Sequence, residues 1–140
     1  MPHGSHAAVS EDTRLVPVPN TIPTHDAVYL AAMETVISIL HDAKPLIGDT
    51  IGIWGVGSIG LMTVDVLCHM KFSVYVFDID PQKIEKAKSL GAQKGETVTK
   101  VDISIEVSGN KNALYQAIEN TKSGGRVVVA SWYGDTETIV

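Results

Sequence analysis

The apolar residues of this 140-residue chain change their spacing several times, and each spacing predicts a different element. From His25 to Asp42 they recur every three or four residues, which predicts a helix with one apolar face. Ile51–Trp54 and Phe72–Phe77 are short apolar runs typical of buried strands. Val101–Val107 predicts another strand. Arg126–Ala130, which follows a turn, is typical of a central strand in a parallel sheet.

Helical patterns separate these strands. The first lies between the two short runs, and five of its residues are expected to face the core: Ile59, Met62, Val66, Leu67 and Met70. The second starts at Asp80-Pro81 and ends near Gly91. The third covers Asn112 to Asn120, and Ala92–Lys100 is too short and polar for more than a vestigial strand. This alternation predicts the α/β class: a Rossmann-type, doubly wound parallel sheet of about five strands, with helices on both faces. An extended segment and a helix precede it.

The connection after Trp54 is a complete G-x-G-x-x-G, Gly55 to Gly60. A strand, this glycine turn, a helix and a second strand that ends in Asp78 together form a dinucleotide-binding fingerprint. Gly55 permits the tight turn, Gly57 lets the backbone approach a pyrophosphate, and Gly60 lets the helix pack closely on the sheet. The free N–H groups of the helix then face the phosphates.

Asp78 sets the expected cofactor. Its carboxylate can accept hydrogen bonds from both hydroxyls of an adenosine ribose, whereas it would repel a 2′-phosphate, so NAD is favoured over NADP. The alternative is a glycine turn that serves only packing, with Asp78 capping the next helix. Ligands of such sheets bind beyond the carboxyl ends of the strands. The residues predicted to meet the cofactor on this basis are Gly55, Gly57, Ser58, Ile59, Gly60, Asp78 and Ile79.

Composition excludes several classes of function. The formal charge of −5 provides no footprint for nucleic acid or acidic membranes. Cys68 is the only cysteine, which favours a reducing cytoplasm and excludes an internal disulfide. No apolar stretch approaches the length of a membrane span. The sequence contains no Cys/His cluster that would indicate a zinc site and no G-x-S-x-G that would indicate a nucleophile elbow.

Several blocks together resemble the cofactor domain of the medium-chain, zinc-type alcohol dehydrogenase superfamily, in particular its sorbitol and threonine dehydrogenases and its bacteriochlorophyllide hydroxyethyl dehydrogenase-like branch. The blocks are Gly48-Asp49-Thr50, the glycine fingerprint, Asp78 with Lys83, Ala87–Ala92, Glu106–Asn110 and Gly124–Val129. The resemblance implies an oxidoreductase that transfers hydride between an alcohol carbon and NAD. It also implies further cofactor contacts: Lys83 at the ribose, and Val107, Ser108, Gly109, Ala130 and Ser131 at the nicotinamide half. Trp132 and Tyr133 are expected either to wall the nicotinamide pocket or to be ordinary packing residues.

The chain also departs from that family. Residues 1–22 resemble only the end of a catalytic domain, and residues 23–140 a Rossmann domain that lacks its last part. The position expected for a zinc ligand falls near Ala31, which cannot bind metal. We therefore expect no catalytic residue and no metal in this chain, which would bind NAD but turn over little alcohol alone. The dimer-forming segment of the family lies beyond Val140, so a homodimer stays possible.

Two other classes of function stay open at this point. The first is a non-enzymatic nucleotide-sensing module, like the regulatory domains of potassium channels, which share the glycine turn and the terminal acid. The second is a structural module that has lost its ligand.

Overall fold

The computed structural model describes residues 6–134, and the chain divides into two compact units, Met1–Leu30 and Ala31–Val140. In the first unit, a short helix, α1 (Thr24–Ala27), follows a segment without regular structure. The second unit contains a five-stranded, all-parallel sheet. The predicted fold class is confirmed.

The sheet has the strand order β3-β2-β1-β4-β5. Its strands are β1 (Thr50–Trp54), β2 (Ser73–Phe77), β3 (Gln93–Lys94), β4 (Val101–Glu106) and β5 (Thr121–Val129). The helices that connect or precede them are α2 (Leu30–Ala43), α3 (Ser58–His69), α4 (Pro81–Ser89) and α5 (Lys111–Glu119), with a 3-10 turn η1 at Gly95–Thr97. The predicted vestigial third strand is thus a two-residue strand followed by one turn.

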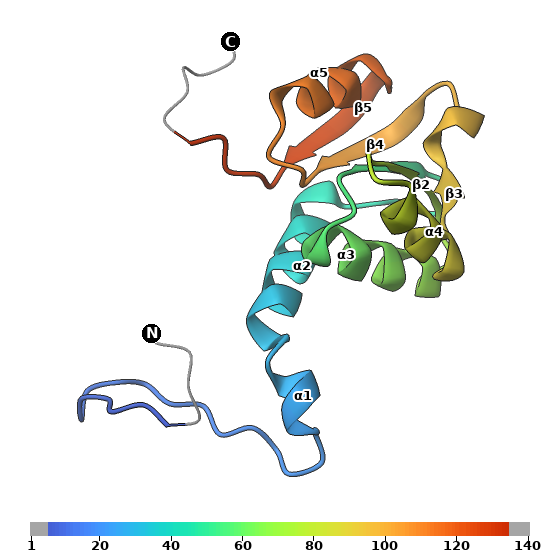
Figure 1. Cartoon of the computed structure of the whole chain (residues 1–140). Helices are drawn as coiled ribbons and strands as arrows, with labels where there is room; N and C mark the ends of the chain where they lie inside the picture. The colour runs from blue at the N-terminus through green and yellow to red at the C-terminus, as the bar shows by residue number, and fades with distance from the viewer. Residues whose placement is uncertain (1–5, 135–140) are drawn as a thin grey trace. The chain divides into compact units, whose positions relative to one another are not determined.

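Helices cover both faces of the sheet (Figure 1). The larger core joins α2, α3 and α4 to one face, through residues such as Ile39, Val64 and Ile84 packed against the inner strands. The smaller core lies on the other face, where Trp54 and Val101 pack against Ala117 of α5. Because both faces are buried, β1 is a nearly continuous apolar run, as expected for a parallel strand.

The predicted helix from His25 to Asp42 is wrong in one respect: it is two helices, because Val28 and Tyr29 form a turn between α1 and α2. Val28 and Tyr29 are exposed, so no core packing holds a continuous helix there. The predicted end before Pro45 is confirmed, since α2 ends at Ala43.

The predicted inward face of α3 is confirmed at Leu67, and Ile59 packs against the core, but the centre of the buried face is shifted. The buried positions are Gly60, Thr63, Val64 and Leu67, whereas Met70 is 55% exposed. Gly60 decides this phase, because a Cβ built there would lie 2.1 Å from the carbonyl oxygen of Gly55. Only the glycine side of the helix can approach the turn so closely, and the residues four and seven positions later lie on that same face.

Arg126–Ala130 does not form a central strand, because β5 lies at the edge of the described sheet. The strand also begins earlier, at Thr121, and its pairing with β4 shifts register between Val101 and Ile103. The side chain of Arg126 reaches the end of α2, where its guanidinium donates a hydrogen bond to the carbonyl oxygen of Ala43. This contact satisfies a carbonyl that the helix itself leaves unpaired.

Candidate functional site

Two of the three fingerprint glycines are required by the fold. Gly55 has a φ of +94°, which glycine adopts without strain, and a Cβ there would lie 2.7 Å from the Cα of Ser108. Its N–H donates to the carbonyl oxygen of Phe77, at 2.8 Å, so the turn is joined to β2. Gly60 is packed against Gly55, as described above. These two positions account for the close approach of β1, α3 and the turn after β4.

Gly57 differs from both. It is exposed, its φ is −70°, and a Cβ built there meets nothing within 4 Å. It precedes α3, where no side chain caps the helix and no acidic residue occupies the first turn. The first N–H groups of a helix have no partner within that helix and carry its positive partial charge. Folding alone therefore gives no reason for glycine at position 57, whereas an anionic ligand approaching these N–H groups does.

Asp78 follows β2, and its carboxylate bridges two backbone segments. One oxygen, Oδ2, accepts from the N–H of Val56 at 2.8 Å, and Oδ1 accepts from the N–H of Asp80 at 2.9 Å. Asp80 is the N-cap of α4 and accepts from the N–H of Gln82. The alternative in which Asp78 itself caps the helix is therefore wrong. Each oxygen of Asp78 keeps a free lone pair, so a ligand hydroxyl can still donate to this carboxylate.

A pocket of about 600 Å³ opens beyond the carboxyl ends of β1, β2 and β4. It brings together seven of the predicted residues: Gly55, Gly57, Asp78, Ile79, Lys83, Val107 and Ser108. The six others, Ser58, Ile59, Gly60, Gly109, Ala130 and Ser131, do not line it. Ser58, Ile59 and Gly60 form the first turn of α3 beside Gly57. Gly109, Ala130 and Ser131 lie together at the ends of β4 and β5, because the N–H of Gly109 donates to the Ser131 hydroxyl.

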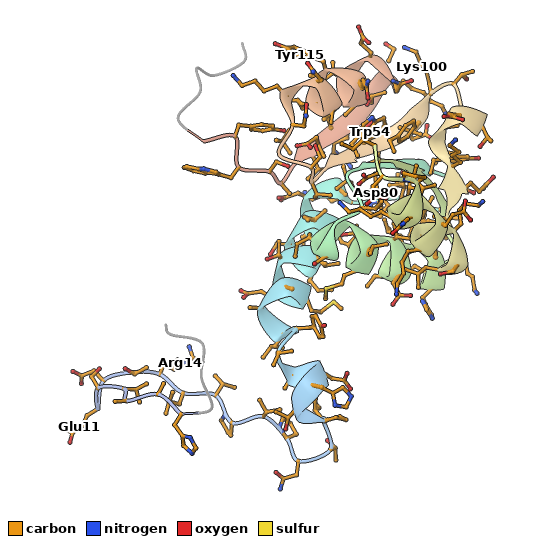
Figure 2. The ribbon with its side chains drawn as sticks, viewed as in Figure 1. Glu11, Arg14, Trp54, Asp80, Lys100 and Tyr115 are labelled. Atoms are coloured by element: carbon orange, nitrogen blue, oxygen red, sulfur yellow. The ribbon has the colours of Figure 1, made fainter. Side chains whose placement is uncertain are left out.

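Sequence reasoning missed the aromatic floor of this pocket. Trp54 and Phe77 are register partners on β1 and β2, and their rings stack with centroids 4.2 Å apart and planes within 6°. Both residues line the pocket, and Figure 2 marks Trp54 on the side of the sheet that α5 covers. The indole N–H of Trp54 is buried and has no hydrogen-bond partner within residues 6–134. The sequence did contain a signal for this floor, because Trp54 and Phe77 are large aromatic residues that each stand directly before a predicted ligand loop.

The same reasoning missed Glu106, the last residue of β4. Its side chain is fully buried, and its carboxylate accepts from the backbone N–H of Ser108 at 2.7 Å and from the Ser108 hydroxyl. The Tyr133 hydroxyl donates to the other oxygen. Tyr133 is therefore a partner of Glu106, while Trp132 next to it is 83% exposed. A glutamate inside an otherwise apolar strand was a signal that this position needs internal donors.

The described part of the chain gives no support for a metal centre. No three His, Cys, Asp or Glu side chains within residues 6–134 gather closely enough to hold an ion. Burial, and then the charge of Asp65, raise the pKa of the Cys68 thiol, which keeps it protonated and unreactive. The residues present do not fit a zinc site, so we derive no step through a metal. In the same range, no helix is both long enough and apolar enough to cross a bilayer.

The doubly wound sheet, the glycine turn and the acid at the end of β2 define a dinucleotide-binding α/β protein. Comparison with known families narrows this class. A family model described as zinc-binding dehydrogenase matches residues 58–140, and the chain belongs to that family.

The chain is also similar to individual relatives. It is 27% identical over 128 residues to the sorbitol dehydrogenase of Bacillus subtilis (strain 168), covering 80% of this chain and 36% of that enzyme. The chain thus spans little more than a third of this relative's length. Two solved structures share its fold: a zinc-binding dehydrogenase of Sinorhizobium meliloti 1021 bound to NADP and the alcohol dehydrogenase rspB of E. coli CFT073 complexed with NADH. Their TM-scores are 0.77 and 0.78 and their identities 24% and 22%, and each match covers 88% of this chain and 41% of the other.

Proposed function

We propose that this chain holds NAD, in preference to NADP, as the cofactor-binding part of an alcohol or polyol dehydrogenase. The observation that carries the proposal is Gly57, where a Cβ would meet no atom within 4 Å among the described residues 6–134. A pyrophosphate placed there would meet the first N–H groups of α3 without steric hindrance. The cofactors bound by the S. meliloti and E. coli structures are of the same chemical class and support this reading.

The lining of the pocket supports binding of the adenosine there. Ile79, which lines the pocket and is fully exposed, offers an apolar surface against which a purine can pack. Asp78, held by two backbone N–H groups, would accept from the hydroxyls of the ribose. A 2′-phosphate in the same place would lie beside this fixed carboxylate. At about 4 Å two like charges repel by about 4 kcal/mol at an effective dielectric constant of 20, which favours NAD.

When bound, the nicotinamide of the cofactor would supply the hydride chemistry. The residues of this chain would bind and orient it: α3 would hold the phosphates, Asp78 and Lys83 the ribose, and the segments after β4 and β5 the nicotinamide half. Within residues 6–134 we find no group that activates an alcohol, and no metal cluster that would replace it. We therefore propose that the chain by itself binds NAD with little or no turnover.

Trp54 provides a direct test, because the chain has two tryptophans and the other, Trp132, is exposed. In the variant Trp132→Phe, all tryptophan fluorescence comes from the floor of the pocket. We expect NAD and ADP each to change this fluorescence saturably, and each to compete with the other. A signal that stays constant with both nucleotides, at concentrations up to millimolar, would refute the proposed function.

A nucleotide-sensing module is the second candidate, and one observation favours it. The pocket is lined by residues at the ends of β1, β2 and β4 together with α4, η1 and α5, and it does not reach Ala130 or Ser131. An adenine nucleotide without a nicotinamide would therefore use most of the same contacts. The two candidates differ in affinity: a dehydrogenase cofactor site should bind NAD more tightly than ADP, whereas a sensor of adenine nucleotides should bind ADP at least as tightly.

A further inference from the structure

The end of β4 and the end of β5 are joined by a set of polar side-chain contacts in addition to the backbone ladder. We refer to Glu106, Ser108, Gly109, Ser131 and Tyr133 as the β4–β5 latch. The two strands are neighbours in the sheet, and their carboxyl ends lie side by side (Figure 1). Glu106 and Val129 are the last register pair of the two strands, so the latch begins where the ladder ends.

Glu106 is the centre of the latch. Its backbone carbonyl accepts from the N–H of Ala130 at 2.9 Å and is 3.4 Å from the Ser131 hydroxyl. Its carboxylate, fully buried, divides its two oxygens between the two segments: one accepts from Ser108, in the turn before α5, and the other from the Tyr133 hydroxyl. A buried carboxylate needs such donors, because without them its desolvation is unfavourable.

Tyr133 supplies the contact that reaches furthest along the chain. Residues Ala130 to Tyr133 have no regular secondary structure, and Trp132 is exposed, so apolar packing does not fix this segment at that residue. Burial first, and then the hydrogen bond and charge of Glu106, raise the pKa of Tyr133 above its ordinary value. The phenol therefore stays protonated and remains a donor across the physiological range.

We infer that Glu106 is a positioning residue, which through Tyr133 and Ser108 holds the segment Ala130–Tyr133 against the Ser108–Gly109 turn before the cofactor arrives. This inference rests on the proposed function, which assigns both segments to the nicotinamide half. Of the latch residues, Ser108 lines the adenosine pocket, whereas Ser131 and Tyr133 do not. Loosening the latch should therefore weaken the binding of the nicotinamide half and leave that of the adenosine half intact, because ordering a loose segment upon binding lowers affinity.

The test compares two ligands, NAD and ADP, in the unmodified chain and three variants. Tyr133→Phe removes the donor, and Tyr115→Phe is the matched control, since Tyr115 lies exposed on α5. We expect Tyr133→Phe to lower NAD affinity about tenfold, while its ADP affinity stays within twofold of the unmodified chain. Tyr115→Phe should change neither. Ser131→Ala, which removes the acceptor of the Gly109 N–H, should lower the NAD affinity but not the ADP affinity.

A structural readout accompanies the affinities. Backbone amide hydrogen exchange at Ala130–Gly134 should become faster in Tyr133→Phe and stay unchanged in Tyr115→Phe. Unchanged exchange, or NAD and ADP affinities that fall by the same factor, would overturn the latch while leaving the proposed function intact. If the unmodified chain bound neither nucleotide, the proposed function would fail, and this inference would fail with it.

Discussion

Replacing Gly57 by alanine separates the demands of the fold from those of a ligand. The added methyl group meets nothing within 4 Å, and the backbone φ of −70° suits any residue. The variant should fold as the unmodified chain does. Since alanine reduces the freedom of the unfolded chain, the free energy of unfolding should rise by about 0.4–1 kcal/mol or stay unchanged.

Binding should respond in the opposite direction. A methyl group at the start of α3 would keep a pyrophosphate from the first N–H groups, and a hydrogen bond to a charged oxygen is worth about 1.5–3 kcal/mol. Losing one such bond lowers NAD affinity about tenfold to a hundredfold. Gly60→Ala provides the contrast, because its Cβ would overlap the Gly55 carbonyl oxygen at 2.1 Å. Overpacking of this kind costs about 1–3 kcal/mol of stability or more.

The assay is urea unfolding with and without NAD. A ligand at 100 times its dissociation constant stabilises the native state by about 2.7 kcal/mol, so the increment in unfolding free energy measures binding. We expect Gly57→Ala to keep its stability without ligand and to lose about half of this increment or more, and Gly60→Ala to lose stability without ligand. If Gly57→Ala kept the full increment, glycine at that position would have no role in binding, and the central argument for the proposed function would be wrong.

Three further predictions concern cofactor choice and stability. Asp78→Asn should raise the ratio of NADP to NAD affinity, measured by calorimetry, at least fivefold. The ratio is used because losing a contact with Val56 or Asp80 would weaken the binding of both cofactors alike. An unchanged ratio would show that Asp78 does not face the ribose. Hydrogen bonds from Thr50 and then Lys122 lower the pKa of Asp102 from 3.8 to about 2, so its stabilisation is present above pH 4 and is lost as the pH falls from about 4 to 2. Between about pH 4 and 2, the free energy of unfolding of Asp102→Asn should therefore fall by about 1 kcal/mol less than that of the unmodified chain, a value that allows for solvent screening. Identical pH profiles of the two proteins would contradict this. Arg126→Met should lower the free energy of unfolding, measured by urea unfolding, by about 1–2 kcal/mol, because it leaves the Ala43 carbonyl unpaired.

The sequence predicted those features that depend on local rules. A glycine turn between a strand and a helix, with an acid at the end of the next strand, has one common three-dimensional solution, and the structure adopts it. The end of α2 before Pro45 and the start of α4 at Asp80-Pro81 are set by the same kind of local chemistry. These features brought Gly55, Gly57 and Asp78 to one pocket, as expected.

Features that depend on contacts between distant segments were not predictable in the same way. The phase of α3 is decided by Gly60 against Gly55, because Met62, Val66 and Met70 form an equally apolar stripe on the helix. The stacking of Trp54 on Phe77 requires the register of β1 and β2, which no local pattern gives. The edge position of β5 is a property of strand order rather than of composition, since Arg126–Ala130 is as apolar as an interior strand.

The contact between Glu106 and Tyr133 belongs to the same group. The two residues are far apart in the sequence, and they meet only because β4 and β5 are neighbours. Sequence reasoning placed Val107, Ser108 and Ser131 near a cofactor but found no group that joins their segments. The glutamate at the end of an apolar strand was the available clue, and its meaning depended on the sheet topology.

The central claim is that NAD binds at the glycine turn and beside Asp78, and amide chemical shifts test it most directly. A ¹⁵N-labelled sample titrated with NAD should show saturable shifts at Val56–Leu61, Ile79 and Asp80, and at Ser108 and Gly109. Amides at the opposite end of the sheet, such as those of Asp49 and Ser73, should stay unshifted. An absence of shifts at saturating NAD, or shifts confined to residues away from the glycine turn, would contradict the account.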